Sequence, residues 1–284
     1  MKRRVFIKHV GFSVSAAFIG SALNAAGSSF KNKIGLQLYS LRDVIGKDPK
    51  KTLADVAAFG YKELETYGYN AGKIFGMSVK DYADHIKQLG MKTVSGHYGI
   101  DLVEQDWDRA CADAKLMGQE YVVVPYLDKK RVENTDQIKK TCDILNKAGE
   151  KANQYGLKMG YHNHAFEFQK VENDKLIFDS MLQELQPSLV SIELDLFWVV
   201  NAGFDPLAYF SAYPGRFHQW HVKDMSKTNR NHNADVGTGS IDFKKIFEQA
   251  EKSGMKHFYI EQETYPLNPE ASVKQSIINL SKIL

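Results

Sequence analysis

The chain of 284 residues is poor in cysteine and has no stretch rich in proline, serine and glycine that could serve as a linker. Its two cysteines, Cys111 and Cys142, both fall in segments with helical character. Two thiols cannot build a disulfide framework or a thiolate metal site, so we interpret them as buried small residues, with a single disulfide as the alternative. The lack of a linker predicts one domain.

A strong net charge is also missing. The formal net charge is +3 at pH 7, and it becomes −1 if Lys2, Arg3, Arg4 and Lys8 are removed with the N-terminal segment. Proteins that bind nucleic acid need a basic surface that neutralises phosphates. A near-neutral chain therefore predicts no nucleic-acid partner.

The N-terminus predicts an export signal. Lys2–Lys8 contains a twin-arginine pattern, and a modestly apolar segment, Val10–Leu23, follows it. This segment is too short and too rich in serine and glycine to span a bilayer stably, and Ala25 and Ala26 offer a cleavage site. We expect a cleavable twin-arginine-type signal peptide over residues 1–26, an exported, periplasmic protein and no stable membrane insertion after cleavage. A retained membrane anchor is the alternative.

Strand-like runs then alternate with helix-like segments over about 255 residues, a length that suits one α/β barrel. The expected strands are Lys33–Tyr39, Tyr61–Glu65, Lys92–Gly96, Tyr121–Pro125, Leu157–His162, Leu189–Asp195, Phe217–Val222 and His257–Glu261. The helices expected after them are Pro49–Phe59, Ser78–Leu89, Gln105–Met117, Asn134–Tyr155, Phe178–Leu185, Pro206–Ala212, Phe243–Lys252 and Pro269–Ile283. Such alternation predicts parallel strands and a single closed (β/α)₈ TIM barrel over residues 33–284. An open doubly wound sheet is the weaker alternative, because no Gly-x-Gly-x-x-Gly motif follows the first strand.

Ligand-type side chains gather where these strands end. His162 and His164 are two residues apart, so on an extended strand they point the same way. One such pair alone is typical of a solvent-exposed surface. However, the ends of the next three strands also carry ligand-type residues, namely Asp195, His221 and Glu261. Barrel strands converge at one mouth, where active sites of this fold lie, so we expect one shared site. Further polar or aromatic candidates for that mouth are Gln37, Arg42, Glu65, His97, Glu167, Trp198, Lys223 and Glu263.

Two imidazoles and two carboxylates form a ligand set that suits one divalent metal ion, either Mn²⁺, Mg²⁺, Co²⁺ or Zn²⁺. Such an ion acts as a Lewis acid on a carbonyl oxygen or on vicinal hydroxyls. The pattern therefore predicts proton transfer on a polyhydroxylated carbonyl compound. Hydrolysis by a metal-bound water is the competing use.

Seven short segments, taken in this order and spacing, carry a family resemblance. They are Leu36–Asp43, Tyr161–His164, Phe166–Phe168, Glu193–Asp195, His221–Asp224, Gly237–Asp242 and Ile260–Glu263. Through them the chain from Lys33 to Leu284 resembles the sugar isomerase/epimerase family of xylose-isomerase-like barrels. That group also includes inosose dehydratases, ketose 3-epimerases and 3-keto-glycoside lyases.

The resemblance implies a metal site with one departure from the family. The family holds one divalent ion with a glutamate, an aspartate, a histidine and a glutamate from the fifth to eighth strands. Asp195, His221 and Glu261 match the last three positions, with Glu263 as an alternative to Glu261. His162 stands where the family carries the fifth-strand glutamate, so a symmetric epimerisation between two carboxylates is doubtful. Either His162 ligates the ion, or nearby Glu167 replaces the missing carboxylate.

The same resemblance implies roles for the other candidates. We expect catalysis from His164, Glu167, Glu261 and Lys223, with His164 or His162 as the base. Substrate binding is expected from Gln37, Arg42, Glu65, His97, Trp198 and Glu263, and Lys223 or Glu65 would orient substrate hydroxyls.

The predicted function is a metal-dependent sugar isomerase or epimerase that acts on an unphosphorylated sugar or keto-sugar. Export and the lack of a glycine-rich phosphate cradle favour a substrate without phosphate. The alternative is a lyase or dehydratase that performs β-elimination on 3-keto-glycosides or inosose-like substrates. Two other classes are an apurinic endonuclease, which would need a basic groove, and a non-catalytic sugar-binding barrel. A homo-oligomer is possible with any of them.

Overall fold

The computed structural model describes residues 30–284, so the signal predicted over residues 1–26 lies outside the described residues. Eight parallel strands close into a barrel in the spatial order β1-β12-β9-β8-β7-β6-β5-β2. They are β1 (Gly35–Gln37), β2 (Glu63–Thr66), β5 (Lys92–His97), β6 (Tyr121–Val124), β7 (Lys158–His162), β8 (Val190–Asp195), β9 (Gln219–Val222) and β12 (His257–Ile260). Every strand expected from the sequence is present, and the closed barrel is confirmed.

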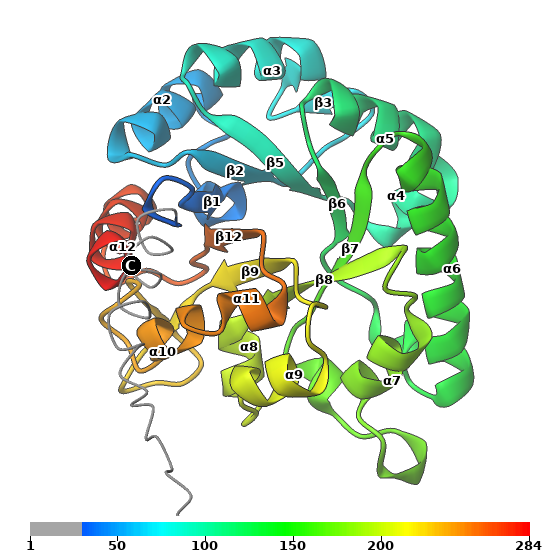
Figure 1. Cartoon of the computed structure of the whole chain (residues 1–284). Coiled ribbons are helices and arrows are strands. Elements are labelled where there is room, and N and C mark those ends of the chain that lie inside the picture. The colour runs from blue at the N-terminus through cyan, green and yellow to red at the C-terminus, as the bar shows by residue number, and fades with distance from the viewer. Residues whose placement is uncertain (1–29) are drawn as a thin grey trace, which may run out of the picture.

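Helices surround the barrel as an outer ring (Figure 1). They are α2 (Pro49–Phe59), α3 (Val79–Gln88), α4 (Ile100–Gln105), α5 (Trp107–Leu116), α6 (Thr135–Gln154), α7 (Ile177–Glu184), α8 (Leu196–Asn201), α9 (Pro206–Ala212), α10 (Phe243–Phe247), α11 (Ala250–Ser253) and α12 (Pro269–Ile283). Two short antiparallel ribbons lie in the loops: β3 (Lys73–Ile74) with β4 (Met77–Ser78), and β10 (Asp224–Met225) with β11 (Asn233–Ala234).

Three helical expectations are corrected by the structure. The helix expected over Gln105–Met117 is present as α5, but it begins at Trp107 and follows another short helix, α4, because the backbone of Asp106 leaves the helical region at φ −147° and ψ 45°. The helix expected over Phe243–Lys252 is divided into α10 and α11. Helix α8 was not expected at all. It begins directly after Asp195, whose Oδ1 accepts a hydrogen bond from Trp198 N at 2.9 Å and so caps the new helix.

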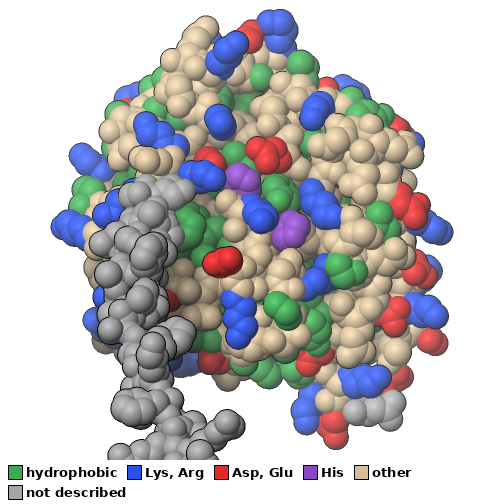
Figure 2. Space-filling model, in the orientation of Figure 1, with side chains coloured by type: hydrophobic (Ala, Val, Ile, Leu, Met, Phe, Trp, Pro, Cys, Tyr) green, Lys and Arg blue, Asp and Glu red, His purple; other side chains and the backbone are tan. Residues whose placement is uncertain are grey.

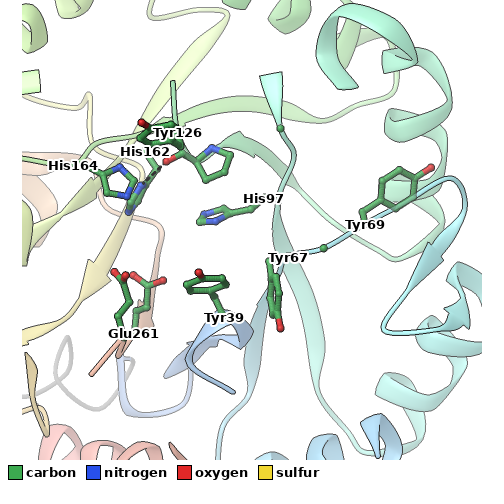
Figure 3. Close-up of a pocket in the computed structure, with 12 residues that line it drawn as sticks. Tyr39, Tyr67, Tyr69, His97, Tyr126, His162, His164 and Glu261 are labelled. Carbon is green, nitrogen blue, oxygen red and sulfur yellow. Dashed lines mark hydrogen bonds between the residues drawn. The ribbon is translucent and has the colours of Figure 1, made fainter. Parts of the chain in front are cut away.

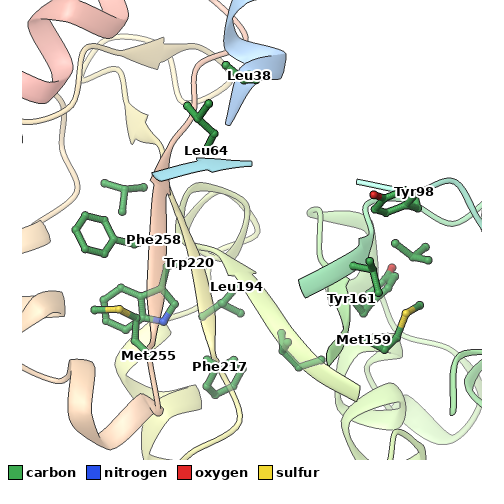
Figure 4. Packing of buried hydrophobic residues seen from close by; sticks show 14 of the residues in the cluster. Leu38, Leu64, Tyr98, Met159, Tyr161, Leu194, Phe217, Trp220, Met255 and Phe258 are labelled. Carbon is green, nitrogen blue, oxygen red and sulfur yellow. The ribbon is translucent and has the colours of Figure 1, made fainter. Parts of the chain in front are cut away.

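The apolar core lies between the strands and the helical ring. Side chains alternate along a strand, so Leu194 on β8 and Trp220 on β9 pack into this outer layer, as Figure 4 shows. The Trp220 ring stacks on Phe210 of α9, with centroids 5.1 Å apart and planes at 4°. The alternate positions of the same strands, Glu193, Asp195 and His221, are buried and polar. Polar side chains therefore occupy the inside of the barrel.

Cys111 and Cys142 are free and buried, as predicted. No helix among residues 30–284 has the length and apolar character needed to cross a membrane. Lysine and arginine side chains alternate with acidic ones over the face that Figure 2 presents, and they form no continuous basic surface there.

Candidate functional site

A pocket of about 410 Å³ opens where the barrel strands end. Its lining residues follow six of the strands, and Figure 3 shows them. They are Tyr39, Tyr67, Gly68, Tyr69, His97, Gly99, Pro125, Tyr126, His162, His164, Glu261 and Glu263. The volume is in the range of small-molecule sites, and the position is where barrel enzymes carry out chemistry.

Four side chains, which we call the upper group, meet at this end of the barrel: His162, Asp195, His221 and Glu261. Their potential ligand atoms all lie within 4.8 Å of one another. His221 Nδ1 is 2.9 Å from Glu261 Oε2, and His162 Nε2 is 3.4 Å from Asp195 Oδ2. The structure thus brings together the four residues that the sequence suggested as metal ligands. Their role as ligands stays a prediction.

Contacts with neighbouring elements orient two members of this group, Asp195 and His162. Asp195 Oδ1 caps α8, which leaves Oδ2 directed to the upper group. His162 Nδ1 lies 3.1 Å from Pro125 O. A carbonyl oxygen only accepts hydrogen bonds, so Nδ1 carries a hydrogen and donates it to Pro125 O. Nε2 of His162 faces the carboxylate Oδ2 of Asp195 at 3.4 Å and has no hydrogen-bond partner. A buried ring nitrogen and a carboxylate oxygen that face each other in this way can both serve as ligands of a cation.

Lys223 follows β9 and reaches the same carboxylates. Its Nζ lies 3.0 Å from Asp195 Oδ2, 2.7 Å from Glu261 Oε2 and 2.6 Å from Glu263 Oε1, and its side chain is fully buried. Burial opposes the charged ammonium, but Asp195, Glu261 and Glu263 raise the pKa of Lys223 well above its usual range. Burial likewise opposes ionisation of Asp195, yet Lys223 and His162 lower its pKa to about 2. Asp195 is therefore ionised at neutral pH.

A second set, the lower group, lies deeper in the barrel and shares His221: Glu65, His97, Glu193 and His221. His221 Nε2 is 2.6 Å from Glu65 Oε2, and His97 Nε2 is 2.9 Å from Glu193 Oε2. Burial opposes the protonated form of His97, but Glu65 and Glu193 raise its pKa to about 9. The charges of His97 and His221 hold the pKa of Glu65 well below its usual range despite burial. Two imidazoliums therefore balance two carboxylates inside the barrel.

The predicted substrate-binding residues divide into two kinds. His97 and Glu263 line the pocket, and the Trp198 ring centroid lies 5.6 Å from that of His164. Gln37 and Glu65 are fully buried and bond to each other, with Gln37 Nε2 2.7 Å from Glu65 Oε2, so neither reaches the pocket.

Arg42 also makes contacts within the protein. Its guanidinium donates to Glu263 O at 2.7 Å and to Tyr265 OH at 2.8 Å. It therefore fixes the loop that carries Glu263.

The loop after β7 separates the two predicted catalytic residues that it carries. His164 lines the pocket, where burial and the neighbouring His162 lower its pKa to about 3, so its imidazole is neutral. Glu167 points elsewhere: its two oxygens accept from Tyr161 OH at 2.6 Å and from His164 N at 2.9 Å, and burial raises its pKa to about 7. Of the two candidates for the missing fifth-strand carboxylate position, these contacts favour His162.

From the sequence, Glu193 was either a residue of the site or a buried structural residue, and Tyr69 and Pro125 were not singled out. The alternation of side chains along β8 places Glu193 on the same side as Asp195, and the structure puts it in the lower group. Tyr69 enters the lining from the loop after β2, and Pro125 acts through its backbone carbonyl. A sequence does not show which backbone carbonyl will accept a hydrogen bond from a side chain, and no pattern pointed to Tyr69.

The fold and the site together define a (β/α)₈ barrel whose strand ends carry a cluster of polar side chains of the kind that binds metal ions. Residues 53–283 match the sequence profile of the xylose isomerase-like TIM barrel family, and the chain belongs to that family.

Three relatives illustrate the family. An inosose dehydratase of Geobacillus thermodenitrificans (strain NG80-2) is 28% identical over 165 residues, which cover 51% of this chain and 54% of that protein. This alignment therefore spans about half the length of the curated relative. A solved sugar phosphate isomerase/epimerase from Parabacteroides distasonis ATCC 8503 is 28% identical with a TM-score of 0.78, covering 88% of this chain and 93% of that one.

The third relative is a solved IolI protein with a bound zinc atom. It has a TM-score of 0.68 and 14% identity, covers 88% of this chain and 97% of its own, and at that identity shows the fold alone. The predicted family is confirmed, and its named relatives are enzymes, so the prediction of an enzyme is confirmed as well.

Proposed function

We propose that this protein is a divalent-metal-dependent lyase. It would remove the proton next to the ketone of an unphosphorylated keto-sugar and expel an oxygen from the carbon beyond. The observation that carries the proposal is the upper group: four side chains from four strand ends, with ligand atoms within 4.8 Å, beside a pocket of about 410 Å³.

The upper group fits a divalent ion on two counts. His162 Nε2 is buried without a hydrogen-bond partner and faces the carboxylate oxygen Oδ2 of Asp195 at 3.4 Å. Two imidazoles and two carboxylates suit Mn²⁺, Co²⁺, Zn²⁺ or Mg²⁺. A divalent ion held there supplies Lewis acidity to a carbonyl oxygen. The solved IolI neighbour, which holds a zinc atom, supports this assignment.

The pocket favours a substrate without phosphate. No lysine or arginine occurs among the described residues that line it, whereas phosphate recognition relies on such cations or on a helix N-terminus. Tyrosine rings line much of the wall instead, and they suit the apolar faces of a sugar ring. The sugar phosphate in the name of the Parabacteroides relative is therefore not transferred to this chain.

Proton transfer can be assigned to groups on two sides of the pocket. Figure 3 shows His162 and His164 on one side and Glu261 on another. Burial opposes ionisation of Glu261, but Lys223 and His221 hold its pKa well below the usual range, so it is a carboxylate that can accept the proton. As that C–H bond breaks, its electron pair forms the new C=C bond and the C–O bond breaks. The neutral His164 imidazole can hydrogen-bond the departing oxygen, which overall takes up the proton that Glu261 removed from carbon and leaves as water or an alcohol.

Lys223 is then a positioning cation. Its three carboxylate contacts keep it protonated, so it does not act as a base.

Isomerase or epimerase action, the function predicted first from the sequence, is the second candidate. It is favoured by the Parabacteroides relative. Elimination stands first because epimerisation between two carboxylates needs one from the fifth strand. His162 occupies that position, and both oxygens of Glu167 are bonded within the loop.

The test is incubation of the metal-loaded protein with 3-keto-glucosides, inososes and free ketoses in D₂O, followed by NMR. Loss of water or an alcohol with formation of an enone supports the lyase. Deuterium at the carbon next to the ketone, in an otherwise intact sugar, supports the isomerase or epimerase and refutes elimination. Turnover of sugar phosphates alone would contradict the proposed substrate class.

A further inference from the structure

Glu65, His97 and Glu193 of the lower group have no part in the chemistry proposed above, although with His221 they also satisfy the distances of a ligand set. We infer that Glu65, supported by Glu193, is a positioning residue that fixes His221 so that Nδ1, and not Nε2, is offered to the divalent ion. This inference rests on the proposed function, because it concerns the geometry of the proposed metal site.

His221 links the two groups through its two ring nitrogens. Nε2 lies 2.6 Å from Glu65 Oε2 and 3.3 Å from Glu193 Oε2. Nδ1 lies 2.9 Å from Glu261 Oε2 and 3.8 Å from Asp195 Oδ2. A histidine that binds a metal uses one nitrogen and donates the hydrogen on the other. When His221 binds a metal, the short contact to Glu65 therefore assigns the retained hydrogen to Nε2, and Nδ1 gives up its hydrogen and offers its lone pair to the upper group.

The carboxylate of Glu65 is itself held in place from β1. Gln37 donates from Nε2 to Glu65 Oε2 at 2.7 Å. The amide of Gln37 cannot turn around, because its Oε1 accepts from the backbone N of Tyr39 at 2.9 Å. A chain of contacts therefore runs from the β1 backbone through Gln37 and Glu65 to His221. Because Glu65 is fully buried, its partners are these protein groups and not the substrate.

The upper and lower groups differ in which of their polar atoms lack a partner. In the lower group Glu65 Oε2 and Glu193 Oε2 each face nitrogens of His97 and His221, although their Oε1 atoms have no hydrogen bond. In the upper group His162 Nε2 has no hydrogen-bond partner, and Asp195 Oδ2, which it faces, pairs with the Lys223 ammonium at 3.0 Å. The unpartnered nitrogen above His221 therefore suits a metal ligand, whereas histidine nitrogens already serve the carboxylates below it.

The chain offers a matched control on the same strand. Glu63 also pairs with a buried histidine, with its Oε2 2.7 Å from His257 Nδ1. Glu63 opens β2, two residues before Glu65, and its ion pair is with His257, not with His221. Glu63→Gln and Glu65→Gln thus remove the same charge from two similar pairs, one of which touches the proposed metal site.

The experiment is calorimetric titration of the full-length protein with Co²⁺, with the visible absorption of bound Co²⁺ recorded in parallel. Loss of an outer carboxylate partner weakens metal binding about 10- to 100-fold. We expect a loss of that size and a changed spectrum in Glu65→Gln, a smaller loss in Glu193→Gln, and wild-type affinity in Glu63→Gln. Melting temperatures establish that each variant is folded.

Wild-type affinity and spectrum in a folded Glu65→Gln protein would overturn the inference, and so would an equal loss in Glu63→Gln. If Glu65→Gln does not fold, Gln37→Leu tests the same chain of contacts, and unchanged Co²⁺ affinity there overturns it. A wild-type protein that binds no Co²⁺ refutes the proposed metal site itself, so the two failures are distinguishable.

Discussion

Replacement of Lys223 by methionine removes the single ammonium that lies within 3.0 Å of three carboxylates, those of Asp195, Glu261 and Glu263. Breaking a buried ion pair from one side costs about 3–5 kcal/mol, because the remaining charge is left without compensation. At about 2–4 °C per kcal/mol for a domain of this size, the melting temperature should fall by roughly 6–20 °C without metal.

A divalent ion should reverse part of that loss. In the wild type the ion must share Asp195 and Glu261 with the ammonium of Lys223, whereas in Lys223→Met it meets no such repulsion. An ion at 100 times its dissociation constant stabilises a protein by about 2.7 kcal/mol. Thermal melts with and without Mn²⁺ should therefore show a larger stabilisation in the variant than in the wild type. A stabilisation in the variant that is no larger would refute the shared site. Lys158→Met is the matched control, because Lys158 contacts the backbone carbonyls of Pro187 and Ser188.

Three further changes separate the roles of neighbouring residues. Asp195→Asn and Asp195→Ala should both abolish metal binding. Calorimetry should find the alanine variant less stable by about 1 kcal/mol, because only asparagine can still cap α8. Equal stability of the two variants would contradict the capping role. Gly96→Ala should lower the free energy of unfolding in denaturant by about 1–3 kcal/mol, since its Cβ would lie 2.5 Å from Gln119 Nε2, whereas Gly46→Ala, with open space around it, should change little. Tyr126→Ala, at an exposed pocket residue, should raise KM roughly 2- to 12-fold with kcat retained, and an unchanged KM would exclude a stacking role.

Much of the barrel was predictable because its signals are local. All eight strands were found within about two residues, since buried parallel strands are short apolar runs between helices. The missed helix α8 shows the limit of this reasoning. Its start depends on Asp195, which also belongs to the upper group, and the sequence pattern cannot show that one carboxylate performs both tasks.

The candidate site was predictable as a set of residues but not as a set of contacts. Strand ends in a barrel converge, so His162, Asp195, His221 and Glu261 could be grouped from their positions alone. Glu65 was expected to bind substrate, yet it lies fully buried against Gln37 and His221. Depth within the barrel separates these roles. That depth depends on register, including the shift between β2 and β5 at Leu64 and Glu65, which no local pattern reveals.

The most direct test of the proposed metal-dependent chemistry is elemental analysis of the purified protein after reconstitution with a mixture of divalent metals. The upper group predicts about one tightly held ion per chain in the wild type, and none in the Asp195→Ala, His221→Ala double variant. Stoichiometric metal in the double variant, or a folded wild type that holds none, would contradict the proposal.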